Sequence, residues 1–200
     1  MSSREQILQN IRSALSSKNK IDMTPLLEEE QQLQQQKAAM DDLAVYFAQQ
    51  FTQIGGSMSY CATQGELYQE IDNIHTALGK PIIGCSNEAV SQFVAHHGIQ
   101  NAVAAKPEEQ YTLGVSICES LVADGGLIIL SSRLGLGTSF KVLPQNLIVI
   151  AFTSQVVATW DDFTERLLQQ SQTLPSSIVA VTPASLDGRT RLHLILIDDQ

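Results

Sequence analysis

From Ser57 to the C-terminus, short apolar runs alternate with amphipathic stretches, and this alternation limits the possible folds more than any other feature of the chain. The apolar runs have the length of buried strands, and several stretches between them have helical periodicity. Strands that alternate with helices predict an α/β fold with a mainly parallel sheet flanked by helices on both faces. The predicted strands are 57–62, 81–85, 101–104, 127–131, 147–152, 177–181 and 192–197, and the predicted helices are 65–78, 87–97 (capped by Ser86) and 160–170, while 113–123 fits either state.

The first 56 residues have a different pattern. Residues 4–15 and 26–54 repeat apolar residues at helical spacing, and Gly55-Gly56 would end the second helix. We therefore expect an N-terminal helical arm over residues 1–56 and an α/β domain over residues 57–200. The apolar stripe between Leu33 and Ile54 also suggests a surface for a homo-oligomer.

Composition excludes several classes of function. The 200 residues carry 12 Lys and Arg against 21 Asp and Glu, a net charge of −9. Nucleic acid is not an expected partner, because phosphate binding needs clustered cations. The apolar runs are too short to span a bilayer, and the start of the chain lacks the apolar core of a signal peptide. We therefore expect no membrane span and a cytoplasmic protein.

The cysteines and histidines suggest no metal site. The 3 cysteines are far apart in the sequence, and neither they nor the 4 histidines have the spacing of metal ligands. We therefore expect no metal and no cofactor in this chain. Cys61 and Cys85 are predicted to pack in the core. Glu119 beside Cys118 disfavours the thiolate of that cysteine.

The segment from Gly114 to Leu130 is the candidate site. Glu119, Asp124 and the pair Gly125-Gly126 interrupt two apolar flanks just before a predicted strand. A carboxylate beside a buried strand is costly unless it is paired or hydrogen-bonded, and glycines allow positive φ or the close approach of a ligand. The alternative is a tight turn with a solvated Asp124.

Two further features suggest chemistry near this segment. Asp124 and Glu119 can form a carboxylate pair for proton transfer, since like charges raise one pKa. The loop over residues 131–138 can cradle a small organic anion with amides and a guanidinium. A flexible hairpin loop is the alternative, and the absence of a full G-x-G-x-x-G disfavours a dinucleotide site. The predicted ligand-binding residues are Ser116, Gly125, Gly126, Arg133, Gly135, Gly137 and Thr138.

The candidate segment resembles the motif of the lactate utilization protein C family, which carries the LUD domain. Gly114-Val115-Ser116 matches its opening, Glu119 its first acid, and Val122-Ala123 with Gly126 the A-I-A-E-T-G-T part. Asp124 stands where the family has Glu, and Gly125 where it has Thr. The opening helix, the Leu143-Pro144 segment and the closing strand are also similar, whereas the T-A-D-I-E motif near the C-terminus is missing.

The resemblance implies a fold like that of the NagB, RpiA and CoA-transferase superfamily. It further implies an accessory subunit in the oxidation of lactate to pyruvate, with the redox centres in separate iron–sulfur partners. The same resemblance makes Asp124 the first candidate for a catalytic carboxylate, followed by Glu119. An alternative is a small-molecule enzyme or binding protein for an organic acid, a sugar phosphate or an acyl-CoA at Asp124 and Gly126. A third interpretation is a pure interaction module.

Overall fold

The computed structural model describes residues 43–96, 98–135, 143–170, 174–186, 188 and 190–199. The predicted helix over 4–15, most of the predicted helix over 26–54 with its proposed oligomer surface, and the candidate residues Gly137 and Thr138 lie outside these residues.

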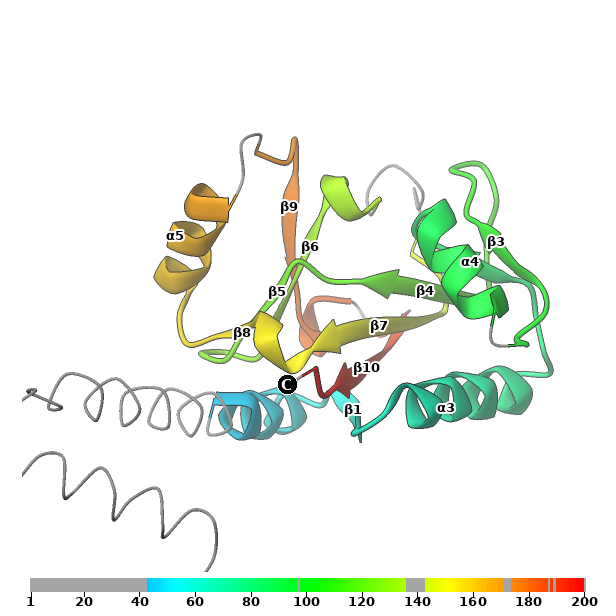
Figure 1. The fold of residues 1–200 in the computed structure, drawn as a ribbon, viewed down its shortest axis with the longest axis horizontal. Helices are drawn as coiled ribbons and strands as arrows, with labels where there is room; N and C mark the ends of the chain where they lie inside the picture. The colour runs from blue at the N-terminus through cyan, green and yellow to red at the C-terminus, as the bar shows by residue number, and fades with distance from the viewer. Residues whose placement is uncertain are drawn as a thin grey trace, which may run out of the picture. The chain divides into compact units, whose positions relative to one another are not determined.

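A six-stranded sheet forms the centre of the fold (Figure 1). Its strand order is β1-β10-β7-β4-β2-β3, and every neighbouring pair is parallel. The prediction of an α/β fold with a mainly parallel sheet is confirmed. The strands are β1 (Ser57–Cys61), β2 (Ile83–Cys85), β3 (Ala102–Ala104), β4 (Leu113–Ile117), β7 (Asn146–Phe152) and β10 (Arg191–Ile197).

Two helices, α3 (Gln64–Ala77) and α4 (Glu88–His96), cover one face of this sheet. The hydroxyl of Thr63 caps α3 by accepting the Glu66 N–H at 3.2 Å. For α4 the predicted cap was wrong, because the Asn87 side chain, and not Ser86, accepts the Val90 N–H at 2.9 Å. Leu67 and Ile71 of α3 and Val90 and Val94 of α4 pack with the sheet residues Cys61, Ile83, Cys85, Leu113, Val115, Ile148, Ile150, Ile195 and Ile197.

On the opposite face, where the sequence predicted helices, a second, four-stranded sheet packs instead, in the order β8-β5-β6-β9. Its strands are β5 (Ser120–Val122), β6 (Leu127–Ser131), β8 (Val156–Val157) and β9 (Ile178–Val181), and β6 is antiparallel to both β5 and β9. Helix α5 (Trp160–Gln170) covers its outer face through Phe163 and Leu167. The sequence did not predict this sheet as a separate layer, since two of its strands are only three and two residues long.

Residues 43–53 form a helix that also packs into the core between the sheets. Phe47 and Phe51 are fully buried there, with their rings stacked at 5.5 Å between centroids. They share this cluster with Leu194 and Leu196 of β10 and Ile128 of β6. The division of the chain into an arm and a domain at residue 56 stays a prediction.

The helices in the described part of the chain were also compared with the length and hydropathy that a bilayer requires. None of them is both long enough and apolar enough to cross a membrane.

Candidate functional site

The carboxyl ends of β2 and β4 meet at the point where the direction of the chain through the sheet reverses. From β2 the chain continues to the outer strand β3, whereas from β4 it continues toward β7 on the other side. In open α/β sheets, ligands bind outside the carboxyl ends of the strands at such a reversal. The residues that follow β2 and β4, namely Ser86, Asn87, Cys118 and Glu119, therefore form the first candidate site.

Glu119 is the charged centre of this edge. The Ser131 hydroxyl donates a hydrogen bond of 2.7 Å to its Oε2, and the Arg133 guanidinium pairs with its Oε1. The Glu119 side chain is 11% exposed and that of Arg133 is 41% exposed. Burial of a carboxylate is costly without partners, and here both oxygens have one. The sequence predicted both residues as site residues but not their ion pair.

Gly135 brings the loop after β6 against the loop after β2. Its φ of 89° lies in the left-handed region, and a Cβ at this position would lie 2.1 Å from the Ser86 carbonyl oxygen. The Asn87 amide donates to the Leu134 carbonyl at 3.1 Å, which fixes the same contact from the other side. Gly135 was predicted as a ligand-binding residue, and in the structure it permits the close contact between these two loops.

Behind this edge, Ser116 and Cys118 are fully buried. The Ser116 hydroxyl donates to the Ile117 carbonyl at 3.1 Å. Gln155 donates to the Cys118 carbonyl at 2.9 Å and accepts the Phe152 N–H at 2.8 Å, so it joins the ends of β4 and β7. Burial, and to a lesser degree the charge of Glu119, raises the pKa of the Cys118 thiol to about 12, as the sequence indicated.

Asp124, Gly125 and Gly126 lie elsewhere, in the turn between β5 and β6. Asp124 is exposed, and its N–H donates to the Ala158 carbonyl at 2.9 Å. Both glycines have positive φ, 86° and 60°, as expected. A Cβ on Gly126 would lie 2.9 Å from the backbone of Phe51, so this glycine permits the close packing of the 43–53 helix.

The predicted site residues therefore fall into two groups. Ser116, Glu119, Arg133 and Gly135 belong to the carboxyl edge of the main sheet. The Asp124-Gly125-Gly126 turn lies at the other end of β5 from Glu119, because the whole strand separates the two acids. The two carboxylates do not form the proton-sharing pair that the sequence suggested, and the geometry matches the alternative of a turn with a solvated aspartate.

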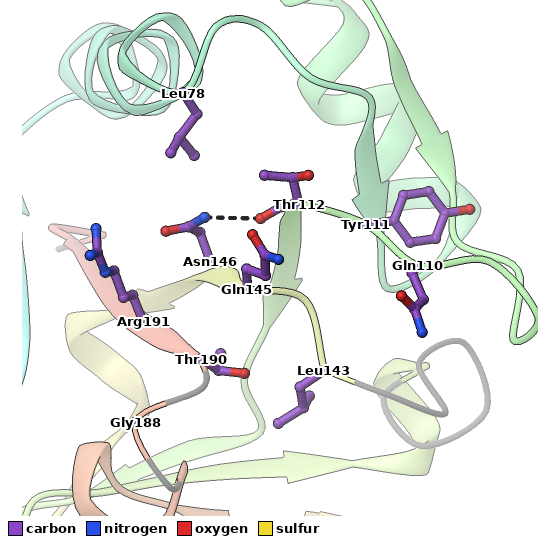
Figure 2. Close-up of a pocket in the computed structure, with 10 residues that line it drawn as sticks. All are labelled: Leu78, Gln110, Tyr111, Thr112, Leu143, Gln145, Asn146, Gly188, Thr190 and Arg191. Carbon is purple, nitrogen blue, oxygen red and sulfur yellow. Dashed lines mark hydrogen bonds between the residues drawn. The ribbon is translucent and has the colours of Figure 1, made fainter.

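A hollow at the opposite, amino edge of the main sheet was not predicted from the sequence (Figure 2). It has a volume of about 890 Å³ and opens where β4, β7 and β10 begin. Asn146, the first residue of β7, donates to the Thr112 carbonyl at 3.0 Å and ties two of these strand starts together. The lining is mostly polar: Gln110, Thr112, Gln145, Asn146, Thr190 and Arg191, with Leu78, Tyr111, Leu143 and Gly188 completing it.

Arg191 gives this amino-edge pocket its charge. It is exposed at the start of β10, and no acidic side chain among the described residues pairs with its guanidinium. Its backbone N–H donates to the Gln145 carbonyl at 2.7 Å, which holds the residue at the rim. An arginine at the start of an apolar strand forms no recognised motif, so the sequence offered no signal for this pocket.

Within the ranges that the structure describes, no group of three or more His, Cys, Asp or Glu side chains is placed to hold a metal ion.

Comparison with known proteins supplies one relative and one fold neighbour. No family model matches the chain. Over 93 residues, 44% of this chain, the sequence is 32% identical to lactate utilization protein B 1 of Bacillus mycoides (strain KBAB4). The chain covers 20% of that relative, about a fifth of its length. A crystal structure of a DUF162 family protein from Deinococcus radiodurans shares the fold, with a TM-score of 0.60, 15% identity and coverage of 80% of this chain and 98% of that chain.

Proposed function

We propose that this chain is a LUD-domain component of lactate utilization that acts as an accessory subunit in the cytoplasm. The observation that carries the proposal is the 93-residue match, at 32% identity, to a lactate utilization protein. The shared fold with the DUF162 protein supports it, since the likeness extends over 80% of the chain. The LUD-like motif of the sequence maps onto β4, β5 and the turn that follows.

The finer part of the proposal is that the chain resembles the C subunit, with the electron-carrying centres in separate iron–sulfur partners. The cysteines support this assignment. Cys61 and Cys85 are buried in the cluster under α3 and α4, and Cys118 is buried in the cluster between the sheets. Burial raises the pKa of Cys85 to about 12, which opposes the thiolate that a cluster ligand must supply.

Gene deletion and co-purification with the tagged chain together test this function. In the source organism, deletion of the gene should abolish growth on lactate but not on pyruvate, and the full chain should restore it. The tagged full chain should then co-purify with a Cys-rich protein that contains iron and sulfide. Normal growth on lactate after deletion, or recapture of the chain without an iron-containing partner, would contradict the proposal.

A second candidate function is the binding of a small organic anion, and the amino-edge pocket favours it. Arg191 supplies a positive charge there that no acidic side chain among the described residues pairs with, whereas the charge of Arg133 at the carboxyl edge is already balanced by Glu119. Amide and hydroxyl groups next to the guanidinium can complete the recognition of a carboxylate. A volume of about 890 Å³ accommodates a small acid or a larger ester of one.

Thermal denaturation with lactate, pyruvate, sugar phosphates and CoA esters locates such a site. A millimolar ligand of micromolar Kd stabilises by about 4 kcal/mol, because the effect grows as RT ln(1 + [L]/Kd). We expect Arg191→Gln to remove the shift and Arg133→Gln to keep it. Loss of the shift in Arg133→Gln alone would move the site to the carboxyl edge. Loss of the thermal shift in Asp124→Ala alone would instead place the site at the turn over residues 124–126.

A further inference from the structure

Four polar side chains form a continuous chain of hydrogen bonds between β1, β10 and α3. The Ser57 hydroxyl lies 2.8 Å from Nδ1 of His193, and Nε2 of the same ring lies 3.1 Å from the Ser59 hydroxyl. Ser59 in turn donates to Oε1 of Glu70 at 2.7 Å, and that oxygen is 3.5 Å from Nε2 of His193. The carboxyl-edge site and the lactate proposal use none of these residues.

The donors and acceptors of these four side chains determine the direction of each hydrogen bond. An ionised Glu70 can only accept hydrogen bonds, so the Ser59 hydroxyl donates one to Glu70. The Ser59 oxygen then accepts a hydrogen bond from Nε2–H of His193. Nδ1 then carries the lone pair, and it accepts a hydrogen bond from the Ser57 hydroxyl. The imidazole is thus held in one tautomer, with its basic nitrogen on the Ser57 hydroxyl.

The surroundings keep this imidazole neutral. Burial lowers the pKa of His193, and the nearby Glu70 carboxylate opposes that effect without cancelling it. The His193 side chain is 22% exposed, and Ser57 is exposed. A neutral, partly desolvated imidazole can accept a proton near pH 7.

Ser57 and His193 both line a cavity of about 430 Å³. Ile74, Leu147 and Pro183 form apolar parts of its wall, and Arg191 is part of its lining as well as of the amino-edge pocket. A small acyl group can therefore reach the Ser57 oxygen, with a cation in the same cavity to attract an anionic substituent. A hydrogen-bonded serine that only stabilised the edge of the sheet would not need this space.

We propose that Ser57 is a nucleophile activated by His193, and that the cavity hydrolyses small carboxylic esters, with preference for those that carry an anionic group. Serine, a base within hydrogen-bond reach and a third group that orients the base are the signature of nucleophilic catalysis. Glu70 and Ser59 are positioning residues, since they act through the imidazole.

The reaction balances with water as the co-reactant. The Ser57 oxygen forms a bond to the ester carbonyl carbon while Nδ1 of His193 takes the hydroxyl proton. The bond from that carbon to the alkoxy oxygen then breaks, and the alcohol leaves with the proton from Nδ1. Water attacks the acyl-serine, its proton passes through Nδ1 back to Ser57, and a carboxylic acid is released.

Active-site labelling of the full chain tests the nucleophile. A fluorophosphonate probe should modify the peptide that contains Ser57, and p-nitrophenyl acetate should release a burst of about one equivalent of p-nitrophenol. Ser57→Ala should abolish both signals, and His193→Gln should slow them by about 100-fold, the usual contribution of a general base. Ser176→Ala is the matched control, because this exposed serine donates to the Ser132 hydroxyl at 2.9 Å and lines neither cavity, and both signals should persist.

The pH profile of the burst separates positioning from mere stability. The charge of Glu70 raises the pKa of His193, so Glu70→Gln should move the acid limb of the profile to lower pH. If Glu70→Gln leaves the pH profile of the burst unchanged, Glu70 is not a positioning residue. Absence of an adduct on the Ser57 peptide, or equal bursts in the wild type and Ser57→Ala, would overturn the proposal as a whole. Neither result bears on the lactate proposal, which growth of the deletion strain on lactate tests separately.

Discussion

A single methyl group added at Gly126 should loosen the packing between the β5–β6 turn and the 43–53 helix. Gly126→Ala introduces two costs. The φ of 60° places a Cβ in the left-handed region, which costs about 1–2 kcal/mol for a residue other than glycine. The new methyl would also lie 2.9 Å from the N and Cα of Phe51, both backbone atoms that cannot rotate away.

Gly125→Ala is the matched control for this substitution. Its φ of 86° carries a similar conformational cost, but the nearest atoms to its Cβ are side-chain carbons of Leu127 at 3.8 Å, an ordinary contact. Overpacking a well-packed region costs about 1–3 kcal/mol. We therefore expect Gly125→Ala to lose about 1 kcal/mol of unfolding free energy and Gly126→Ala to lose about 2–4 kcal/mol.

Urea denaturation followed by far-UV circular dichroism measures this difference. With a slope of about 1–3 kcal/mol per molar urea, a difference of about 2 kcal/mol separates the two midpoints by about 1 M. If the two variants unfold within about 0.5 kcal/mol of each other, the contact with Phe51 does not constrain position 126 and the reasoning fails. A larger loss in Gly125→Ala would also refute it.

Four further predictions concern the core, the cysteines, His193 and the ion pair of Glu119 with Arg133. Phe51→Ala should cost about 3–5 kcal/mol of unfolding free energy, against less than about 1 kcal/mol for the half-exposed Tyr46→Ala, measured by urea denaturation. All 3 cysteines should resist Ellman's reagent at pH 8 until the protein is unfolded, and rapid reaction of even one native thiol would contradict their burial. Because the pKa of folded His193 lies below its unfolded value of about 6.5, the protein should lose stability as pH falls below that value, and His193→Gln should reduce the loss. A double-mutant cycle of Glu119→Gln and Arg133→Gln should give a coupling energy of about 1 kcal/mol, reduced by high salt, and a value near zero would make the ion pair incidental.

The main sheet could be predicted because its signals are local. β2, β7 and β10 are apolar runs, and the helices α3 and α4, which have one apolar face, separate β1, β2 and β3 along the chain. β4 was not assigned, because residues 113–123 fitted either state. Short strands gave weaker signals. The three residues of β5 pair with the two of β8, which lie far along the chain, and the place of β8 in a second layer depends on that pairing.

The candidate site was only partly predictable, for a related reason. Glu119 and Arg133 drew attention as isolated charges near apolar strands, yet 14 positions separate the partners of their ion pair. Nothing in the local sequence indicated that Ser57 would meet His193, because 136 positions separate them. Asp124 was predicted as a site residue because it lies beside two glycines, but the second of them, Gly126, is needed for the close packing of the turn on the 43–53 helix.

The parallel pairing of β1 with β10 has a consequence for how the chain folds as it is made. β1 is the first strand of the sheet to be synthesised and β10 is the last, yet β10 lies inside the sheet between β1 and β7. The sheet cannot be completed until β10 has left the ribosome, and such long-range pairing slows folding. Until then β1 and β7 present unpaired edges, which favour aggregation. Termination of synthesis before β10 should therefore leave an insoluble product rather than a shortened native protein.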